Sequence, residues 1–229
     1  VIEFNNNFLV FSPYAKQIAM VKKEELSAKK TTKKLEHDGF FGRPEKVIGA
    51  KRITFIVTND CNLRCIYCYL NGGEKKDYMP ISVGINIIKK YVKNPDLHIN
   101  FFGGEPTMNM PFIKKMLAFV EHRKIKPLYS IVTNGCVNND VLNFLVSNDF
   151  SFHVSMDGAP EQHDKTRPFY DGKGSASEVG KTIKYLVKNS KNTVIVRSTI
   201  TTSNIDHLIE AIDYWHGLGI KFIHFETVD

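Results

Sequence analysis

No long hydrophobic run occurs in the sequence, and this absence excludes a chain that crosses a membrane. No apolar stretch approaches the roughly 18 residues that a membrane-spanning helix requires. The first residues, VIEFNNNFLVF, carry an acid where a secretory signal peptide would carry basic charge. We therefore expect a soluble, cytoplasmic protein that has no membrane partner.

Cysteine is also scarce, and its distribution argues against a disulfide framework. The chain has 4 cysteines, of which Cys61, Cys65 and Cys68 lie close together and cannot all pair with one another. In a cytoplasmic chain, such bunching indicates metal or redox chemistry. The fourth cysteine, Cys136, stands alone, and we interpret it as a buried structural residue.

Acidic residues are outnumbered by basic ones, 24 to 31, and the net charge is +7. A basic surface suits nucleic acid, an acidic peptide or an anionic small molecule. The basic stretches Lys22 to Lys34 and Lys114 to Lys126 do not interleave aromatic residues as a base-stacking surface does. We therefore do not expect a nucleic-acid partner. The hydrophobic content of 42% argues against a disordered chain.

From residue 52 onward, the sequence alternates between strand and helix patterns. Short apolar or β-branched runs predict strands, and stretches with helical spacing separate them. The expected strands are Arg52–Thr58, Leu97–Phe102, Leu128–Thr133, Phe150–Met156, Thr193–Thr201 and Phe222–Thr227. The expected helices are Ile81–Val92, Pro111–His122, Asn138–Ser147, Glu178–Lys188 and Asp206–Leu218.

This alternation predicts parallel β-α units, because a crossover helix returns the chain to the same strand direction. Periodicity leaves open a doubly wound sheet, a full barrel and a partial barrel. A parallel sheet that is covered on both faces has strands that are apolar on both sides. The run from Ile53 to Val57 fits that pattern.

The first fifty residues differ from the rest. Phe8–Phe11 and Gln17–Val21 flank a Ser-Pro-Tyr turn and predict a short hairpin, which a lysine-rich helix or linker follows. We expect residues 1–50 to be an extension (a lid, an edge extension or part of a partner-binding module) and residues 51–229 to be the core domain. The chain starts with Val and stops directly after the sixth core strand, so we expect it to be truncated there.

The most specific motif is Cys61-Asn-Leu-Arg-Cys65-Ile-Tyr-Cys68, which directly follows the first core strand. Functional loops of α/β folds lie at this end of a strand. Three nearby cysteines would hold a four-iron cluster and leave one iron open for a substrate or cofactor. Two alternatives remain: a zinc site, which would need a fourth nearby ligand, and buried cysteines on one face of a helix. The polar residues around the first cysteine favour a loop over that helix.

A second motif, Phe101-Phe-Gly103-Gly104-Glu105-Pro, ends the second core strand. Its glycines would let the backbone approach a ligand closely, and the Glu105 carboxylate can accept hydrogen bonds from an ammonium group. Taken alone, the motif is equally typical of an ordinary turn.

Together the two motifs resemble the radical S-adenosylmethionine (SAM) superfamily, whose signature is this cysteine spacing with an aromatic residue, here Tyr67, before the last cysteine. The resemblance runs from about residue 51 to residue 229 and implies a partial (βα)6 TIM-like barrel. It further implies a [4Fe-4S] cluster held by Cys61, Cys65 and Cys68, whose open iron binds SAM. Reductive cleavage of SAM would then release a 5′-deoxyadenosyl radical, which abstracts hydrogen from a substrate.

The resemblance also assigns residues to the SAM site. Gly103, Gly104 and Glu105 match the segment that holds the SAM amino group, and Tyr67 belongs to the cofactor-binding set. Asn134 follows the third strand, where it is placed to meet cofactor or substrate.

Two later segments extend this set. Ser155, in Ser-Met-Asp-Gly after the fourth strand, matches a residue near the SAM ribose. Arg167, in His-Asp-Lys-Thr-Arg, suits the SAM carboxylate because its guanidinium can bind in a bidentate manner. Arg197 is a second candidate for that carboxylate. The alternative for each residue is a turn or a surface ion pair.

The segments SMDG, HDKTR, GKGS and TTSN resemble the branch that carries a C-terminal SPASM domain with auxiliary iron–sulfur clusters, a domain not present in this sequence. We expect an enzyme that modifies a peptide or protein, and the short N-terminal hairpin favours a ribosomal peptide maturase that forms a crosslink such as a thioether. The alternatives are a sulfatase-maturating-type enzyme that oxidises Cys or Ser to formylglycine, and a non-catalytic metal-binding module. The expected partners are the peptide or protein substrate and an electron donor such as flavodoxin or ferredoxin.

Overall fold

A computed structural model describes residues 2–4, 7–12, 17–22, 51–92 and 97–227. The chain divides into two compact units, Val1–Ile48 and Gly49–Asp229, which are described separately below. The lysine-rich helix or linker that the sequence predicts after the hairpin lies outside the described residues.

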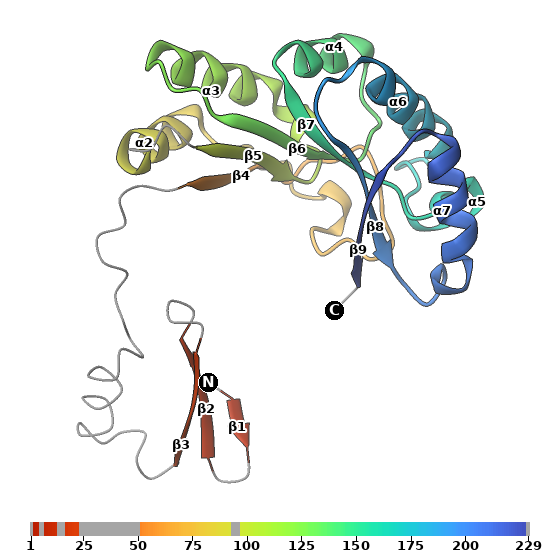
Figure 1. Ribbon diagram of the computed structural model, residues 1–229, viewed down its shortest axis with the longest axis horizontal. Coiled ribbons are helices and arrows are strands. Elements are labelled where there is room, and N and C mark those ends of the chain that lie inside the picture. The colour runs from red at the N-terminus through yellow and green to blue at the C-terminus, as the bar shows by residue number, and fades with distance from the viewer. Residues whose placement is uncertain (1, 5–6, 13–16, 23–50, 93–96, 228–229) are drawn as a thin grey trace. The chain divides into compact units, whose positions relative to one another are not determined.

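The N-terminal unit contains a small antiparallel sheet of strands β1 (Ile2–Phe4), β2 (Asn7–Ser12) and β3 (Gln17–Lys22), in that order (Figure 1). Strands β2 and β3 form the predicted hairpin, with Ser12 opposite Gln17. Strand β1, which pairs with the other edge of β2, was not predicted, because three residues are too short for a periodic pattern.

The second unit is built on a six-stranded parallel sheet, as the β-α alternation predicts. Its strands are β4 (Arg52–Thr58), β5 (His98–Gly103), β6 (Leu128–Thr133), β7 (Phe150–Ser155), β8 (Val194–Ile200) and β9 (Phe222–Thr227). They neighbour one another in chain order, from β4 to β9. This order identifies an open, barrel-like sheet, because a doubly wound sheet reverses its strand order at a switch point.

The helices that cover this sheet lie on its outer, convex side in Figure 1. They are α2 (Ile81–Tyr91), α3 (Met110–His122), α4 (Asn139–Ser147), α5 (Pro160–Thr166), α6 (Ala176–Asn189) and α7 (Leu208–Gly217), with 3-10 turns at Asn71–Gly73, Pro106–Asn109 and Ile205–His207. Chain-ordered strands produce this arrangement because every right-handed crossover then passes over the same face. Within the described residues, no helix is long and apolar enough to cross a membrane.

The expectation that the strands are buried on both sides is wrong. Along β4 the side chains of Ile53, Phe55 and Val57 are buried, whereas Ile56 is 50% exposed. The physical reason is that the helices cover one face, so the alternate side chains of each strand point toward the open concave side. Residues on that concave side are therefore free to line a site.

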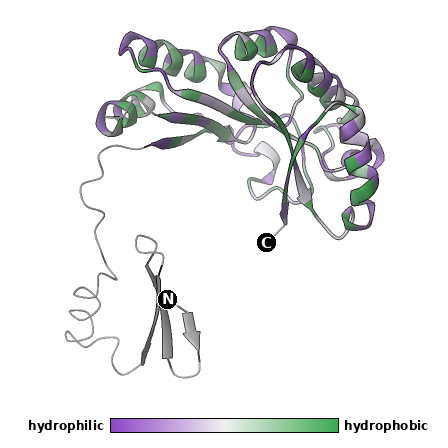
Figure 2. Ribbon diagram, viewed as in Figure 1, coloured by the Kyte–Doolittle hydropathy of each residue, from purple (hydrophilic) through white to green (hydrophobic). Residues whose placement is uncertain are grey.

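The core lies between the sheet and the helices. A row of aromatic rings crosses the helix-facing side of the sheet: the ring centroids of Phe55 and Phe101 are 6.1 Å apart, and those of Phe101 and Phe150 are 5.9 Å apart. Trp215 of α7 is fully buried against the same layer. Figure 2 shows hydrophobic and hydrophilic residues mixed along each helix, as expected where one helix face is buried.

Helix α5 was not predicted. Its buried side chains are polar, Gln162, His163 and Thr166, so it carries no apolar stripe that a search for helical periodicity would detect. Pro160 occupies the first turn, where its missing N–H has no intrahelical partner to lose. This short helix carries Arg167 at its C-terminal cap.

Candidate active site

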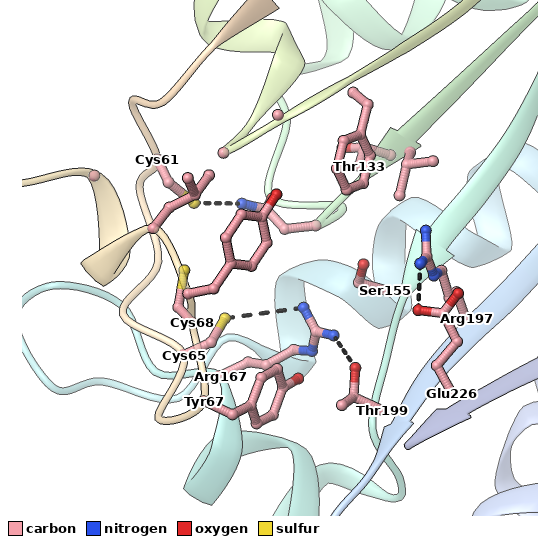
Figure 3. Close-up of a pocket in the computed structure, with 18 of the residues that line it drawn as sticks. Cys61, Cys65, Tyr67, Cys68, Thr133, Ser155, Arg167, Arg197, Thr199 and Glu226 are labelled. Carbon is pink, nitrogen blue, oxygen red and sulfur yellow. Dashed lines mark hydrogen bonds and ion pairs between the residues drawn. The ribbon is translucent and has the colours of Figure 1, made fainter. Parts of the chain in front are cut away.

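A cavity of about 420 Å³ lies at the carboxyl ends of the core strands, where the loops after the strands meet (Figure 3). The predicted site residues that line it are Cys61, Cys65, Tyr67, Cys68, Gly103, Gly104, Asn134, Ser155 and Arg167. Glu105 is absent from this lining. The cysteines lie on one side of the cavity, and Arg197 and Glu226 lie on the opposite side.

The three cysteines lie in a loop that another part of the chain holds in place. The backbone N–H of Arg64 donates to the carbonyl of Pro168 (2.8 Å), and that of Ile66 donates to Thr166 (3.0 Å). No helix spans Cys61–Cys68 in this described segment, so the alternative of cysteines packed on one helix face is wrong. The last residue of α5 and the segment directly after it thus hold the loop whose thiols line the cavity.

The thiols are free and only partly exposed. Burial raises the pKa of Cys61 to about 11, and it also raises the pKa of Cys65, an effect that Arg167 opposes. Cys61 Sγ accepts hydrogen bonds from the Leu63 N–H (3.4 Å) and from Asn134 Nδ2 (3.6 Å). Protonated thiols of this kind release their protons when a metal binds.

The donor set fits a [4Fe-4S] cluster. Such clusters take cysteine thiolates as ligands, and three thiols share one wall of this cavity, with polar donors directed at two of the sulfurs. Within the described part of the chain, no three His, Cys, Asp or Glu side chains converge closely enough to hold a single metal ion.

The two glycines of the second motif lie against the segment that leads into the cysteine loop. The N–H of Gly104 donates to the carbonyl of Thr58 (2.8 Å), and that of Glu105 donates to Asp60 (2.8 Å). A Cβ at Gly103, whose φ is +144°, would lie 2.3 Å from the Thr58 oxygen, and one at Gly104 would lie 2.4 Å from the Asp60 oxygen. Glycine is therefore required here for close contact between two loops, in addition to any contact with a ligand.

Glu105 is fully buried, and its carboxylate is occupied by donors of the chain itself. Oε1 accepts from the N–H and hydroxyl of Thr107 (3.1 and 2.7 Å), and Oε2 accepts from the N–H of Asn134 (2.7 Å). The Thr133 hydroxyl lies 3.0 and 3.1 Å from the two oxygens. Burial raises the pKa of Glu105, and these hydrogen bonds oppose that rise. The carboxylate thus joins the turn after β5 to the end of β6.

Asn134 connects the end of β6 to the cysteine loop. Its Nδ2 donates to Asn62 Oδ1 (2.7 Å) as well as to Cys61, and its Oδ1 accepts from the N–H of Cys136 (2.9 Å). Asn62 Nδ2 in turn donates to the Cys136 carbonyl (3.0 Å). The sequence motif contains Asn62, but its partnership with Asn134 was not predicted, because 72 residues separate the two.

Arg167 is almost fully buried and is held beside the cysteine loop. Its Nε lies 2.9 Å from Asp157 Oδ2, its Nη1 lies 3.8 Å from Cys65 Sγ, and its Nη2 donates to Thr199 (3.3 Å). The guanidinium also lies 5.3 Å from the centre of the Tyr67 ring. A guanidinium has five N–H donors, so these contacts leave donors on both terminal nitrogens for an anionic group in the cavity.

Asp157 is the residue that organises this side of the site, and the sequence analysis gave it no role. Besides Arg167, its carboxylate accepts from the Tyr67 hydroxyl, from the Thr166 hydroxyl (2.9 Å) and from the Thr199 N–H (3.0 Å). Burial disfavours its charge, but Arg167 and these donors hold the pKa of Asp157 below its usual value. Its position, directly after the carboxyl end of a predicted strand, is the sequence signal that could have identified Asp157 as a site residue.

The wall opposite the cysteines carries an ion pair between Arg197 of β8 and Glu226 of β9. Arg197 also lies 5.8 Å from the centre of the Phe102 ring. To bind the SAM carboxylate, as the sequence predicts, Arg197 would therefore have to share its guanidinium with Glu226. Ser155 lies between the two walls in Figure 3, and among the described residues its hydroxyl has no hydrogen-bond partner.

Three relatives are informative about this chain. An uncharacterized protein of Methanocaldococcus jannaschii is 32% identical over 187 residues, which cover 80% of this chain and 64% of that protein. A cysteine-type anaerobic sulfatase-maturating enzyme of Clostridium novyi is 33% identical over 183 residues (73% and 48%). The radical SAM cyclopropyl synthase TigE of Paramaledivibacter caminithermalis is 29% identical over 188 residues (72% and 39%). The chain thus spans between 39% and 64% of the length of these relatives.

A solved structure agrees with the fold and with the sequence family. The structure of native anSMEcpe with bound AdoMet superposes with a TM-score of 0.68 at 26% identity, covering 77% of this chain and 52% of that one. This similarity confirms the partial TIM-like barrel. The sequence profile of the Radical SAM superfamily matches residues 55–224, which is more than half of the chain. The chain therefore belongs to the radical SAM superfamily, as its two motifs predict.

Proposed function

We propose that this chain is the catalytic barrel of a radical SAM enzyme that modifies a peptide or protein. The observation that carries the proposal is the cavity itself, which collects three free thiols, a buried arginine and an unpaired serine hydroxyl at the carboxyl ends of the strands. In barrels of this type, catalysis is located at that end of the strands. Family membership supports the same conclusion.

Cys61, Cys65 and Cys68 would hold a [4Fe-4S] cluster, which, when bound, supplies the electron that cleaves SAM. Arg167 keeps N–H donors available for the SAM carboxylate, since Asp157 and Thr199 occupy only part of its guanidinium. The Ser155 hydroxyl is available to a ribose oxygen. Tyr67 lines the cavity, and its hydroxyl donates a hydrogen bond to Asp157.

The roles of the remaining predicted residues differ in kind. Gly103 and Gly104 line the cavity with backbone, so they can meet the SAM amino group through backbone atoms. Glu105 acts on that group indirectly, because its oxygens are already bonded to Thr107, Thr133 and Asn134. It is a positioning residue for the turn.

The substrate that we propose is a ribosomally made peptide that receives a crosslink such as a thioether. The name of one relative, a cysteine-type anaerobic sulfatase-maturating enzyme, supports chemistry on a protein or peptide. The sulfatase-maturating relative supports an alternative, oxidation of Cys or Ser to formylglycine. In either case the electron that reduces the cluster would come from a carrier such as flavodoxin or ferredoxin. Auxiliary iron–sulfur clusters in a C-terminal domain stay a prediction.

The cofactor assignment is tested by reconstituting the protein with iron and sulfide without oxygen. We expect about four iron atoms per chain, as one [4Fe-4S] cluster requires, and release of 5′-deoxyadenosine from SAM and dithionite. Cys65→Ala should lose both, whereas Cys136→Ala is the matched control and should keep both. Colourless protein that holds one zinc would overturn the proposal.

The substrate assignment is tested by mass spectrometry of candidate peptides encoded beside the gene. A thioether or carbon–carbon crosslink removes two hydrogen atoms from the peptide. Formylglycine formation from cysteine removes two hydrogen atoms and also replaces the sulfur with oxygen. Formylglycine formation from serine removes two hydrogen atoms only, but it leaves an aldehyde, which a crosslink does not. Loss of two hydrogens without an aldehyde supports the maturase. An aldehyde in a sulfatase-derived peptide, with or without loss of sulfur, supports the alternative and contradicts the maturase.

A further inference from the structure

The side-chain hydrogen bonds to the three thiols are unequal. Asn134, a neutral amide, donates to Cys61 Sγ, and Arg167, a cation, donates to Cys65 Sγ. Among the described residues, Cys68 Sγ accepts no hydrogen bond from a side chain. Hydrogen bonds and charges around the sulfurs shift the potential of an iron–sulfur cluster, because an added electron makes the cluster more negative.

The position of the cation depends on Asp157. The Asp157 side chain is fully buried, and the Arg167 side chain is 10% exposed, so solvent screens this ion pair poorly. Asp157 also accepts hydrogen bonds from the hydroxyl of Tyr67, whose ring lies beside the guanidinium, and from the hydroxyl of Thr166, which precedes Arg167 in the chain. The arginine therefore has one carboxylate partner, at Nε, and one sulfur partner, at Nη1.

We propose that Asp157 is a positioning residue that holds the Arg167 guanidinium against Cys65, and that this buried pair sets the reduction potential of the cluster. The inference rests on the proposal that Cys61, Cys65 and Cys68 hold that cluster. Its consequence is that the two charges act with opposite sign. The cation stabilises the reduced state, and the carboxylate opposes it while keeping the cation in place.

The test is an EPR-monitored redox titration of the reconstituted chain without SAM. Arg167→Met removes the cation and its N–H donor, so the potential should fall. Asp157→Asn keeps the shape and a hydrogen-bonding oxygen while removing the negative charge, so the potential should rise. We expect each variant to change the ratio of reduced to oxidised cluster at fixed potential by at least about threefold, where tenfold corresponds to about 59 mV for one electron.

Helix α5 offers matched controls. Glu161 and Lys165 form an exposed ion pair on this helix, with side chains 75% and 64% exposed. Glu161→Gln and Lys165→Met change the same charges as the test variants, but water and salt screen them, so neither should shift the potential. Arg167→Lys keeps the charge and should restore most of the potential lost in Arg167→Met.

The outcomes separate the possible explanations. If both Arg167→Met and Asp157→Asn lower the potential, the two charges do not act with opposite sign and the inference is overturned. An unchanged potential in Arg167→Met with full iron content would also overturn it. If Asp157→Asn does not fold, the comparison of Arg167→Met with Arg167→Lys decides whether the cation sets the potential. Wild-type protein without iron would instead overturn the cluster assignment, and this inference with it.

Discussion

Glu105→Gln tests whether the carboxylate of the second motif supports the fold or contacts SAM directly. Glutamine has nearly the same shape, but one carboxylate oxygen becomes an NH2 group. If that group replaces Oε2, it faces the N–H of Asn134, now 2.7 Å from the oxygen; if it replaces Oε1, it faces the N–H of Thr107, now 3.1 Å away. Either orientation leaves one backbone donor without an acceptor, whereas the threonine hydroxyls can rotate to accept.

The expected loss of stability follows from these contacts. A buried donor without an acceptor costs about 1–3 kcal/mol, and the remaining hydrogen bonds lose the strength that a charged acceptor gives them. Removing a buried charge offsets part of this loss, as the raised pKa of Glu105 indicates. We therefore expect a net destabilisation of about 2 kcal/mol, and a melting temperature lower by roughly 4–8 °C for a domain of this size.

The assay combines thermal unfolding, followed by circular dichroism, with measurement of SAM affinity. Since Glu105 does not line the cavity, the affinity for SAM should fall less than about tenfold, whereas loss of a direct ammonium contact would cost about ten- to a hundredfold. Glu178→Gln, in an exposed ion pair with Lys181, is the control and should change stability by less than about 0.5 kcal/mol. An unchanged melting temperature together with a large loss of affinity would refute this reasoning.

Three further predictions follow from the site. Cys65→Ser should bind markedly less iron than wild type in an elemental analysis, whereas Cys136→Ser should bind the wild-type amount, because Cys65 lines the cavity and Cys136 does not. His163 is buried with a pKa lowered to about 4, so the unfolded chain binds a proton more readily than the folded one; stability should fall as pH drops from about 6.5 to 4, and His163→Gln should flatten that part of a urea-unfolding profile. Gly104→Ala should destabilise the fold and lower iron content, because its Cβ would meet the Asp60 oxygen, whereas Gly217→Ala, which meets no atom within 4 Å, should be tolerated in the same two measurements.

The sequence alone determined the family and the order of the six core strands. The spacing of Cys61, Cys65 and Cys68 is a local property, because the three cysteines lie on a single loop. The alternation of strands and helices is also local, since periodicities of two and 3.6 residues are visible within each segment. The cysteine spacing and the strand–helix alternation can both be recognised from the sequence, because neither depends on contacts between residues that are distant in the chain.

The tertiary structure alone decided the supporting contacts of the site. Arg167 and Cys65 are separated by 102 residues, and Tyr67 and Asp157 by 90. No local pattern distinguishes Asp157 from an acid in an ordinary turn, and helix α5, which carries the arginine, buries polar rather than apolar side chains. The partners of these residues become defined only when the parallel strands bring their carboxyl ends together.

The same distinction explains Glu105 and the open face of the sheet. A carboxylate after two glycines predicts a ligand contact. The fold instead surrounds it with Thr107, with Thr133 at the end of β6, and with Asn134 directly after that strand. Likewise, an apolar run such as β4 does not reveal whether its second face is covered. That depends on the order of all six strands, because only the direction of the crossovers decides which face the helices pack against.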